Sequence, residues 1–197
     1  MSRGKNSKNR SGSKYRILAM GMVGAGLFII GAVVLFTLPK PGSNVSDEPG
    51  DYASVVPVAV NFPAPALELS DLQGKRASLE AYRGQVVLIN NWATWCPPCR
   101  AEMPTLQAYF QDHREQGFTL IGIEAGDPQE NVAEFAKQYS LSFPIWLDPQ
   151  NESLSGFYNA SLPNSYVVDK EGTVVMGWTG AISRDMLEKH VTPLLED

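Results

Sequence analysis

Apolar residues in the segment 86–196 follow two periods that alternate along the chain. Runs of consecutive apolar residues predict buried strands, whereas apolar residues three or four positions apart predict helices with one buried face. The predicted strands are 86–92, 118–124, 143–147 and the two arms of a hairpin over 165–178. The predicted helices are 99–110, 129–139, 152–158 and 183–196. This alternation predicts an α/β domain with a partly parallel sheet, covered by helices and closed by the antiparallel hairpin.

The segment that precedes this pattern is extended. Residues 52–85 contain turn sequences at DLQG and YRG between apolar stretches, so the folded domain is predicted to occupy 52–197. Residues 39–51 are rich in proline, glycine, serine and acidic residues, a composition that predicts a linker.

The longest apolar stretch lies near the N-terminus. Residues 17–38 contain no charged residue, and as a helix they would span about 33 Å, enough for the core of a bilayer. A cleaved signal peptide has a shorter apolar region ending at a small-residue site, and a helix buried in a globular core would not follow a cationic tip, so an uncleaved anchor is favoured. The tip, residues 1–16, carries basic residues and no acid. We therefore expect a single-pass signal-anchor in the cytoplasmic membrane, with a cytoplasmic N-terminus and an extracytoplasmic domain.

Charge is distributed unevenly along the chain. The formal net charge is -5, and all 21 acidic residues lie beyond the basic tip. The body of the protein is therefore strongly acidic. Nucleic acid is excluded as a partner, because phosphates attract the opposite charge.

The only two cysteines lie together in NNWATWCPPCRAEMP, where the strand 86–92 gives way to a helix. The free amides and dipole of a helix N-terminus stabilise a thiolate, so we expect the pKa of Cys96 to fall below the value of about 8.5 for free cysteine. Pro97 and Pro98 suit the first helical turn, where an amide has no intrahelical acceptor, although they also remove donors near the sulfur. Cys99 lies one turn further on, within disulfide reach of Cys96.

Three interpretations of the cysteine pair compete. A zinc half-site needs two more ligands, and His113 and His190 are single and far apart, most simply surface residues. A structural disulfide closing so short a loop would restrain little of the unfolded chain. A redox pair between a strand and a helix is the favoured interpretation, and neither a metal nor a cofactor is expected.

The segment WATWCPPCRAEMP resembles the active-site segment of thioredoxin-fold proteins, and specifically the membrane-anchored TlpA/ResA-like thiol–disulfide oxidoreductases of the redoxin superfamily. The resemblance covers about residues 60–195 and includes the lead-in FPAPALELSDLQGKRASLEAYRGQVVLINNWATWCPPC. It implies a thioredoxin fold, with a central mixed sheet flanked by helices and an N-terminal extension. It also implies exchange with protein disulfides at Cys96-Pro-Pro-Cys99.

The segment LPNSYVVDKEG resembles the part of the family that contains a cis proline. The resemblance implies that Pro163 is cis and faces the cysteines, and that the backbone of Leu162 pairs with bound substrate. Trp95, together with Pro97 and Pro98, is expected to contribute to the substrate contact surface. Trp92 is expected in the core.

Two positions differ from related sequences. Asn90 stands where thioredoxin has a buried aspartate, so the proton route of thioredoxin is absent. The family often has an acid after the next strand, which matches Asp127 best and Glu124 second; either could exchange a proton, and both could instead be solvated loop acids. Asn91 replaces an aromatic residue, which we interpret as a difference in packing.

The resemblance also implies a direction and partners. Related proteins keep selected cysteines reduced, including those that attach haem in cytochrome c biogenesis, which predicts a reductase acting in cell redox homeostasis and fed by an integral-membrane thiol-electron donor. A peroxiredoxin-like peroxidase is an alternative, but Thr94 lies two residues before Cys96 and not the three that such a site requires. A non-enzymatic copper-binding chaperone is another alternative, weakened because no Met or His lies close to Cys96 in sequence.

Overall fold

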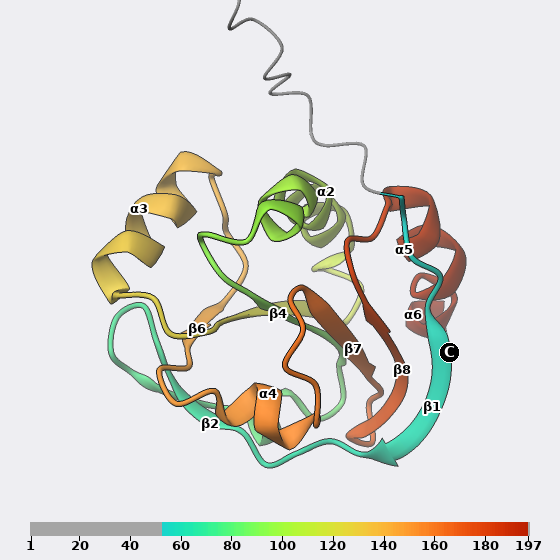
Figure 1. Ribbon diagram of the computed structural model, residues 1–197. Coiled ribbons are helices and arrows are strands. Elements are labelled where there is room, and N and C mark those ends of the chain that lie inside the picture. The colour runs from blue at the N-terminus through green and yellow to red at the C-terminus, as the bar shows by residue number, and fades with distance from the viewer. Residues whose placement is uncertain (1–52, 197) are drawn as a thin grey trace, which may run out of the picture. The chain divides into compact units, whose positions relative to one another are not determined.

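The computed structural model describes residues 53–196, in which a single eight-stranded sheet carries the fold (Figure 1). Its strand order is β1-β8-β7-β4-β5-β6-β2-β3. The strands are β1 (Val58–Pro63), β2 (Glu68–Asp71), β3 (Arg76–Ser78), β4 (Val86–Trp92), β5 (Phe118–Glu124), β6 (Ile145–Leu147), β7 (Asn164–Val168) and β8 (Thr173–Thr179). The central strand β4 is parallel to β5 and antiparallel to β7, so the sheet is mixed, as predicted.

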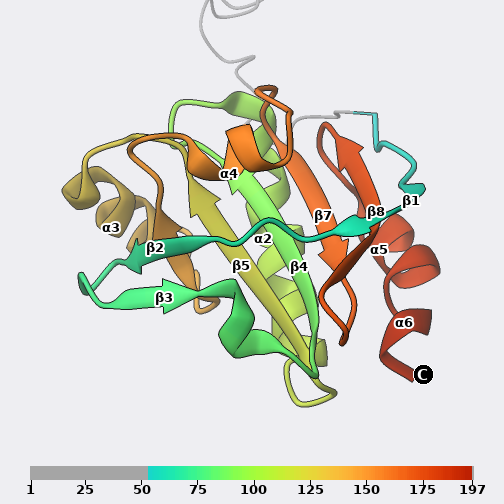
Figure 2. The ribbon, with the colours of Figure 1, turned by 90° about the horizontal axis from the view of Figure 1, so that it is seen from below.

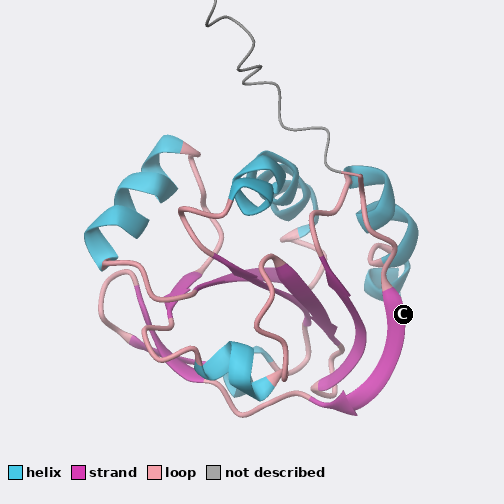
Figure 3. Cartoon of the chain, viewed as in Figure 1, coloured by secondary structure: helices cyan, strands magenta, loops and turns pink. Residues whose placement is uncertain are grey.

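The helices lie on both faces of this sheet (Figure 3). They are the 3-10 helix η1 (Leu79–Tyr82) and the α-helices α2 (Pro97–His113), α3 (Gln129–Gln138), α4 (Glu152–Gly156), α5 (Arg184–His190) and α6 (Pro193–Glu196). Helices α2, α3 and α5 cover one face, and α4 lies on the other (Figure 1).

Most predicted elements match the structure, but the last helix does not. The predicted helix 183–196 is divided into α5 and α6. The amides of Val191 and Thr192 both donate to the carbonyl of Leu187, which closes α5. Pro193 then starts α6, because proline has no amide to continue the first helix but suits the first turn of a new one. The predicted helix 99–110 is extended at both ends in α2.

The lead-in 58–78 adds strands to both edges of the sheet. It pairs through β1 with β8 at one edge and through β2 with β6 at the other. Between these strands it crosses the face of the sheet opposite α2 (Figure 2). The predicted turn at DLQG is present, with the carboxylate of Asp71 accepting from the amides of Gln73 and Lys75 and Gly74 at a φ of 76°.

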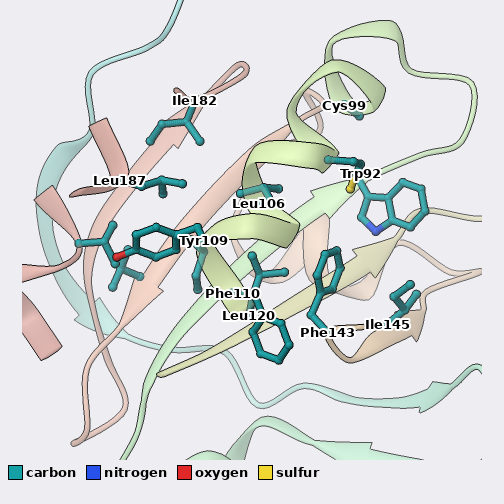
Figure 4. Packing of buried hydrophobic residues seen from close by; sticks show 14 of the residues in the cluster. Trp92, Cys99, Leu106, Tyr109, Phe110, Leu120, Phe143, Ile145, Ile182 and Leu187 are labelled. Atoms are coloured by element: carbon teal, nitrogen blue, oxygen red, sulfur yellow. The ribbon is translucent and has the colours of Figure 1, made fainter. Parts of the chain in front are cut away.

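Side chains of β4 alternate between two apolar clusters, as the pleat of a strand requires. Leu88 joins the cluster under α2, whereas Ile89 joins the cluster under the lead-in. Figure 4 shows the first cluster, in which Trp92, Leu106 and Cys99 lie between α2 and the sheet. The same alternation directs Asn90 and Asn91, which lie just before the last residue of the strand, to opposite faces.

The predicted tip 1–16, anchor 17–38 and linker 39–51 lie outside the described residues. Within residues 53–196, no helix has the length and apolar character needed to cross a bilayer.

Candidate active site

The two cysteines are joined at the start of α2, in a disulfide with a Cα–Cα distance of 5.3 Å. Cys96 is the N-cap of the helix, and its Sγ accepts a hydrogen bond from the amide of Cys99 at 3.3 Å. Pro97 and Pro98 occupy the first helical turn, where the missing amides break no intrahelical bond. The site therefore has one sulfur at the positive end of a helix and a second sulfur one turn behind it.

The two tryptophans of the segment differ in exposure. Trp92 is fully buried in the core, whereas 65% of Trp95, next to Cys96, is exposed. The expected burial of Trp92 is confirmed, whereas the contact of Trp95 with substrate stays a prediction. The exposed indole thus lies next in sequence to Cys96, a residue that is itself only 3% exposed.

Pro163 lies at the same end of the sheet as the cysteine segment. The predicted cis bond between Leu162 and Pro163 is confirmed. Pro163 directly precedes β7, whose first residue, Asn164, pairs with Asn91 near the end of β4. The carbonyl of Pro163 accepts from the amide of Gly180 at 2.8 Å, which fixes the loop against the end of β8.

Asp127 is tied to the cysteine segment by two hydrogen bonds. Its Oδ2 accepts from the Thr94 amide at 3.0 Å and from Thr94 Oγ1 at 2.6 Å. Burial alone would raise the pKa of Asp127, but the hydrogen bonds from Thr94 and Glu124 outweigh it, and the pKa is lowered. Asp127 is therefore an ionised acceptor that holds the loop two residues before Cys96.

Glu124 ends β5 and is fully buried beside Asp127. Its Oε2 accepts from the Asp127 amide at 2.9 Å, and its Oε1 has no hydrogen-bond partner among the described residues. Burial and the neighbouring Asp127 carboxylate raise the pKa of Glu124 to about 8, against the lowering effect of the amides of Asp127 and Gly126. Of the two predicted acids, Glu124 is thus the one that carries a proton at neutral pH.

A third acid, Glu102, was missed by the sequence analysis. It lies on α2, one turn after Cys99, and only 2% of it is exposed. Its Oε1 accepts from Asn90 Nδ2 at 2.9 Å and its Oε2 from the Ile182 amide at 3.1 Å. Burial raises its pKa to about 8, although both hydrogen bonds lower it. The available signal was its spacing, because positions 99, 102 and 106 share one face of a helix.

Asn91 is a buried hydrogen-bonding residue, and its interpretation as a difference in packing is wrong. Its Nδ2 donates to Asn164 Oδ1 at 2.8 Å, and its Oδ1 accepts from Ser153 Oγ at 2.6 Å. Only 1% of Asn91 is exposed, so the amide needs these partners to be buried without loss of stability.

The two histidines are not placed for metal binding. His113 is buried and not on the surface as expected, because its ring packs against Tyr109 with centroids 4.3 Å apart and lies 3.5 Å from a Glu188 oxygen. In the part of the chain that the structure describes, no cluster of three or more His, Cys, Asp or Glu side chains could hold a metal ion.

Comparisons with known proteins agree with this geometry. Residues 60–176 match the AhpC/TSA family. Thiol-disulfide oxidoreductase ResA from Geobacillus thermodenitrificans is 37% identical over 134 residues, which cover 68% of this chain and 77% of the relative. ResA from Bacillus cereus is 31% identical over 170 residues, covering 85% of this chain and 93% of the relative.

Solved structures show the same fold. A thioredoxin family thiol:disulfide interchange protein from Chlorobium tepidum has a TM-score of 0.63 and 28% identity, over 70% of this chain and 99% of its own. A secreted thiol-disulfide isomerase from Corynebacterium glutamicum has a TM-score of 0.67 at 21% identity, over 74% of this chain and 95% of its own, and supports the fold alone. The chain has a thioredoxin-like fold and belongs to the AhpC/TSA family, within which it is a ResA-type thiol–disulfide oxidoreductase.

Proposed function

We propose that the protein is a membrane-anchored, extracytoplasmic reductase of protein disulfides. The observation that carries the proposal is the disulfide between Cys96, the N-cap of α2, and Cys99, one turn behind it. A helix N-terminus favours the thiolate form, and the thiolate is the species that attacks a disulfide. The enzyme class of the relatives supports exchange chemistry, while the direction and the location are our inference.

In the proposed reaction, reduced Cys96 attacks one sulfur of a substrate disulfide as a thiolate. One substrate thiolate leaves, and a mixed disulfide joins the substrate to Cys96. Cys99 then loses its proton and attacks Cys96 Sγ, which closes the disulfide seen here and releases the second substrate thiolate. Two electrons pass to the substrate, and each released thiolate takes up a proton. A Cys99→Ser variant should accumulate the mixed disulfide, because its resolving thiol is absent.

Glu124 is the proposed proton carrier for these steps. Its raised pKa, about 8, keeps a proton available near neutral pH. Asp127 has a lowered pKa and accepts two hydrogen bonds from Thr94, so its proposed role is to position the cysteine segment. The proposed substrate contacts are Trp95, Pro97, Pro98 and the backbone of Leu162. Pro163 directly follows Leu162, to which it is joined by the cis peptide bond.

The direction of transfer follows from the proposed location. An extracytoplasmic reductase must be recharged from an integral-membrane donor of thiol electrons, and an anchor over residues 17–38 would keep it near that donor. A role in cytochrome c maturation, by reduction of haem-attachment cysteines, is the form of this proposal that the family resemblance favours. The protein substrate would then be a disulfide in an apocytochrome.

The reduction potential of the cysteine pair tests the direction. It is measured by equilibrating the protein with dithiothreitol or glutathione and quantifying Cys96 and Cys99 thiols. A potential near about -270 mV, the thioredoxin value, supports a reductase, and one near about -120 mV, the DsbA value, identifies a disulfide donor. Purified protein that consumes peroxide with a thiol donor would instead support the peroxidase alternative, and Cu(I) retained by the reduced pair would support the chaperone.

Location is tested separately. A reporter that is active only outside the cytoplasm is fused after Asp197, and the mass of the product is measured. An active reporter on a full-length product supports the anchor. A silent reporter contradicts the location, and a product shorter by about 38 residues identifies a cleaved signal.

A further inference from the structure

Asn91 connects three elements at the active-site end of the sheet. It lies on β4 and points to the face opposite α2, where its side chain meets Ser153 of α4 and Asn164 of β7. The exposures of Ser153, Asn91 and Asn164 are 0%, 1% and 0%. These three side chains form what we call the Asn91 group.

The Asn91 group is a directed chain of hydrogen bonds. Ser153 Oγ donates to Asn91 Oδ1 at 2.6 Å, and Asn91 Nδ2 donates to Asn164 Oδ1 at 2.8 Å. Asn164 Nδ2 then donates to the carbonyls of Ser161 at 2.6 Å and Asn159 at 3.2 Å. Both hydrogens of the last amide are used, so the chain ends on the backbone that leads to Leu162.

The loop reached by this chain is fixed on both sides of Leu162. Before it, the side chain of Asn159 donates to Thr179 Oγ1 at 2.9 Å and accepts from the Ser161 amide at 3.1 Å. After it, the carbonyl of Pro163 accepts from Gly180. Within residues 53–196, neither the amide nor the carbonyl of Leu162 has a hydrogen-bond partner.

An extended polypeptide can use such a free main-chain donor and acceptor. Unpaired backbone groups next to a strand bind an added strand by main-chain hydrogen bonds, and affinity depends on how well the groups are ordered beforehand. A disulfide between small molecules that lack a peptide backbone cannot use them. The groups that order Leu162 should therefore affect the two kinds of substrate differently.

We propose that Asn91, acting through Asn164 and with Ser153, positions the Leu162 backbone and thereby sets the preference for polypeptide disulfides. Asn91, Asn164 and Ser153 are positioning residues, since none of them touches the sulfurs. The inference rests on the exchange reaction of the proposed function and names the residues that give it a polypeptide substrate.

The test compares two substrates across three variants of the full-length protein. One substrate is a fluorescent peptide held to a second peptide by a disulfide, and the other is bis(2-hydroxyethyl) disulfide. The variants are Asn91→Ala, Ser153→Ala as the milder change, and Ser142→Ala as the control. Ser142 also bonds an amide side chain, Gln107 at 2.8 Å, but in the loop after α3. All rates are measured at a temperature where unfolding curves show each variant fully folded.

We expect Asn91→Ala and Ser153→Ala to lower the ratio of kcat/KM for the peptide to kcat/KM for the small disulfide about tenfold, mainly through KM. The Ser142→Ala control should keep the ratio of the unsubstituted protein. An unchanged ratio in both Asn91→Ala and Ser153→Ala, or an equal fall in the control, overturns the proposal. If the unsubstituted protein reduces neither substrate, the reductase direction is wrong, and the ratio is measured for oxidation of the corresponding dithiols.

Discussion

Asn90 and Asn91 are neighbours on β4, yet they support opposite sides of the active site. Asn90 points toward α2 and donates to Glu102 and to Ser165 Oγ, at 2.9 and 3.0 Å. Asn91 points toward α4 and reaches the loop before Pro163. Because side chains alternate across a strand, two adjacent amides hold the cysteine helix and the proline loop by separate sets of hydrogen bonds.

The two sets differ in their response to protons. The Asn90 side contains Glu102, a carboxyl group that changes its charge near pH 8. The hydrogen bonds of the Asn91 side chain reach only an alcohol and an amide, neither of which titrates. The comparison indicates that the Asn90 side chain contacts a carboxyl group with a raised pKa, whereas the Asn91 side chain contacts no carboxyl group.

The largest effect should come from replacing Glu102. Its folded-state pKa, about 8, lies above the ordinary value of 4.5. Between these values the folded state holds a proton that the unfolded state has lost, so the contribution of Glu102 to stability is highest below pH 4.5, falls as pH rises, and levels off above pH 8. One such group contributes a slope of up to about 1.4 kcal/mol per pH unit. In Glu102→Gln, urea unfolding at several pH values from 5 to 8 should show a slope reduced by that amount.

The control for this prediction is Glu134→Gln, which removes an exposed carboxyl group of α3. It should keep the slope of the unsubstituted protein. A Glu102→Gln variant with an unaltered slope would show that the two sides of the site do not differ in their response to pH.

Removing each asparagine in turn should give the next largest effect. Asn90→Ala and Asn91→Ala should each lower the free energy of unfolding by about 1–3 kcal/mol, because buried partners lose a donor. Only Asn90→Ala should also raise the pKa of Glu102, since the Asn90 amide is one of the two hydrogen bonds that lower it. Carbon-detected NMR titration of the glutamate carboxyl groups measures the pKa of Glu102 in each variant. Equal shifts of the Glu102 pKa in both variants would show that the hydrogen bonds of Asn90 and those of Asn91 are not separate sets.

The smallest effect should be the change that Asp127→Asn causes in the pKa of Glu124, the second buried glutamate of the site. The Asp127 carboxylate raises the pKa of Glu124, after burial the largest cause, so neutralising it should lower that pKa. Glu102 has no carboxylate among the causes of its shift, and its titration should stay the same. The same NMR titration follows both residues. A Glu124 pKa that does not move would assign its shift to burial alone.

Much of the fold could be predicted because the pattern of apolar residues within a segment was sufficient to identify it as a strand or a helix. The strands 86–92 and 118–124 are buried on both faces, so their apolar runs identify them, and both have the predicted bounds. The amphipathic stripe of α3 was similarly clear, with an end that differs from the prediction by one residue. The division of the last helix into α5 and α6 was not predicted, because the apolar spacing continues through Pro193 although proline has no amide to continue the helix.

The polar part of the site could not be predicted in the same way. The sequence pattern around a glutamate on a helix or an asparagine in a strand does not show whether its side chain is solvated or buried. A polar side chain can be buried where the fold supplies a hydrogen-bond partner, and here that partner lies far along the chain. Glu102 accepts from Ile182, 80 residues later, and Asn91 donates to Asn164, 73 residues later. Only the folded topology brings these groups together.

The start of the described chain is fastened to the loop before α5. The Val55 amide donates to the carbonyl of Ala181 at 3.1 Å, and Ser54 Oγ accepts from the Ser183 amide at 2.8 Å. Between these two attachments lies Ile182, whose amide donates to Glu102. A pulling force applied to the chain ahead of Ser54 would thus enter the domain at the loop that holds Glu102. Mechanical tension on the domain would then act on the proton affinity of that carboxyl group through one peptide unit, the one that joins Ala181 to Ile182.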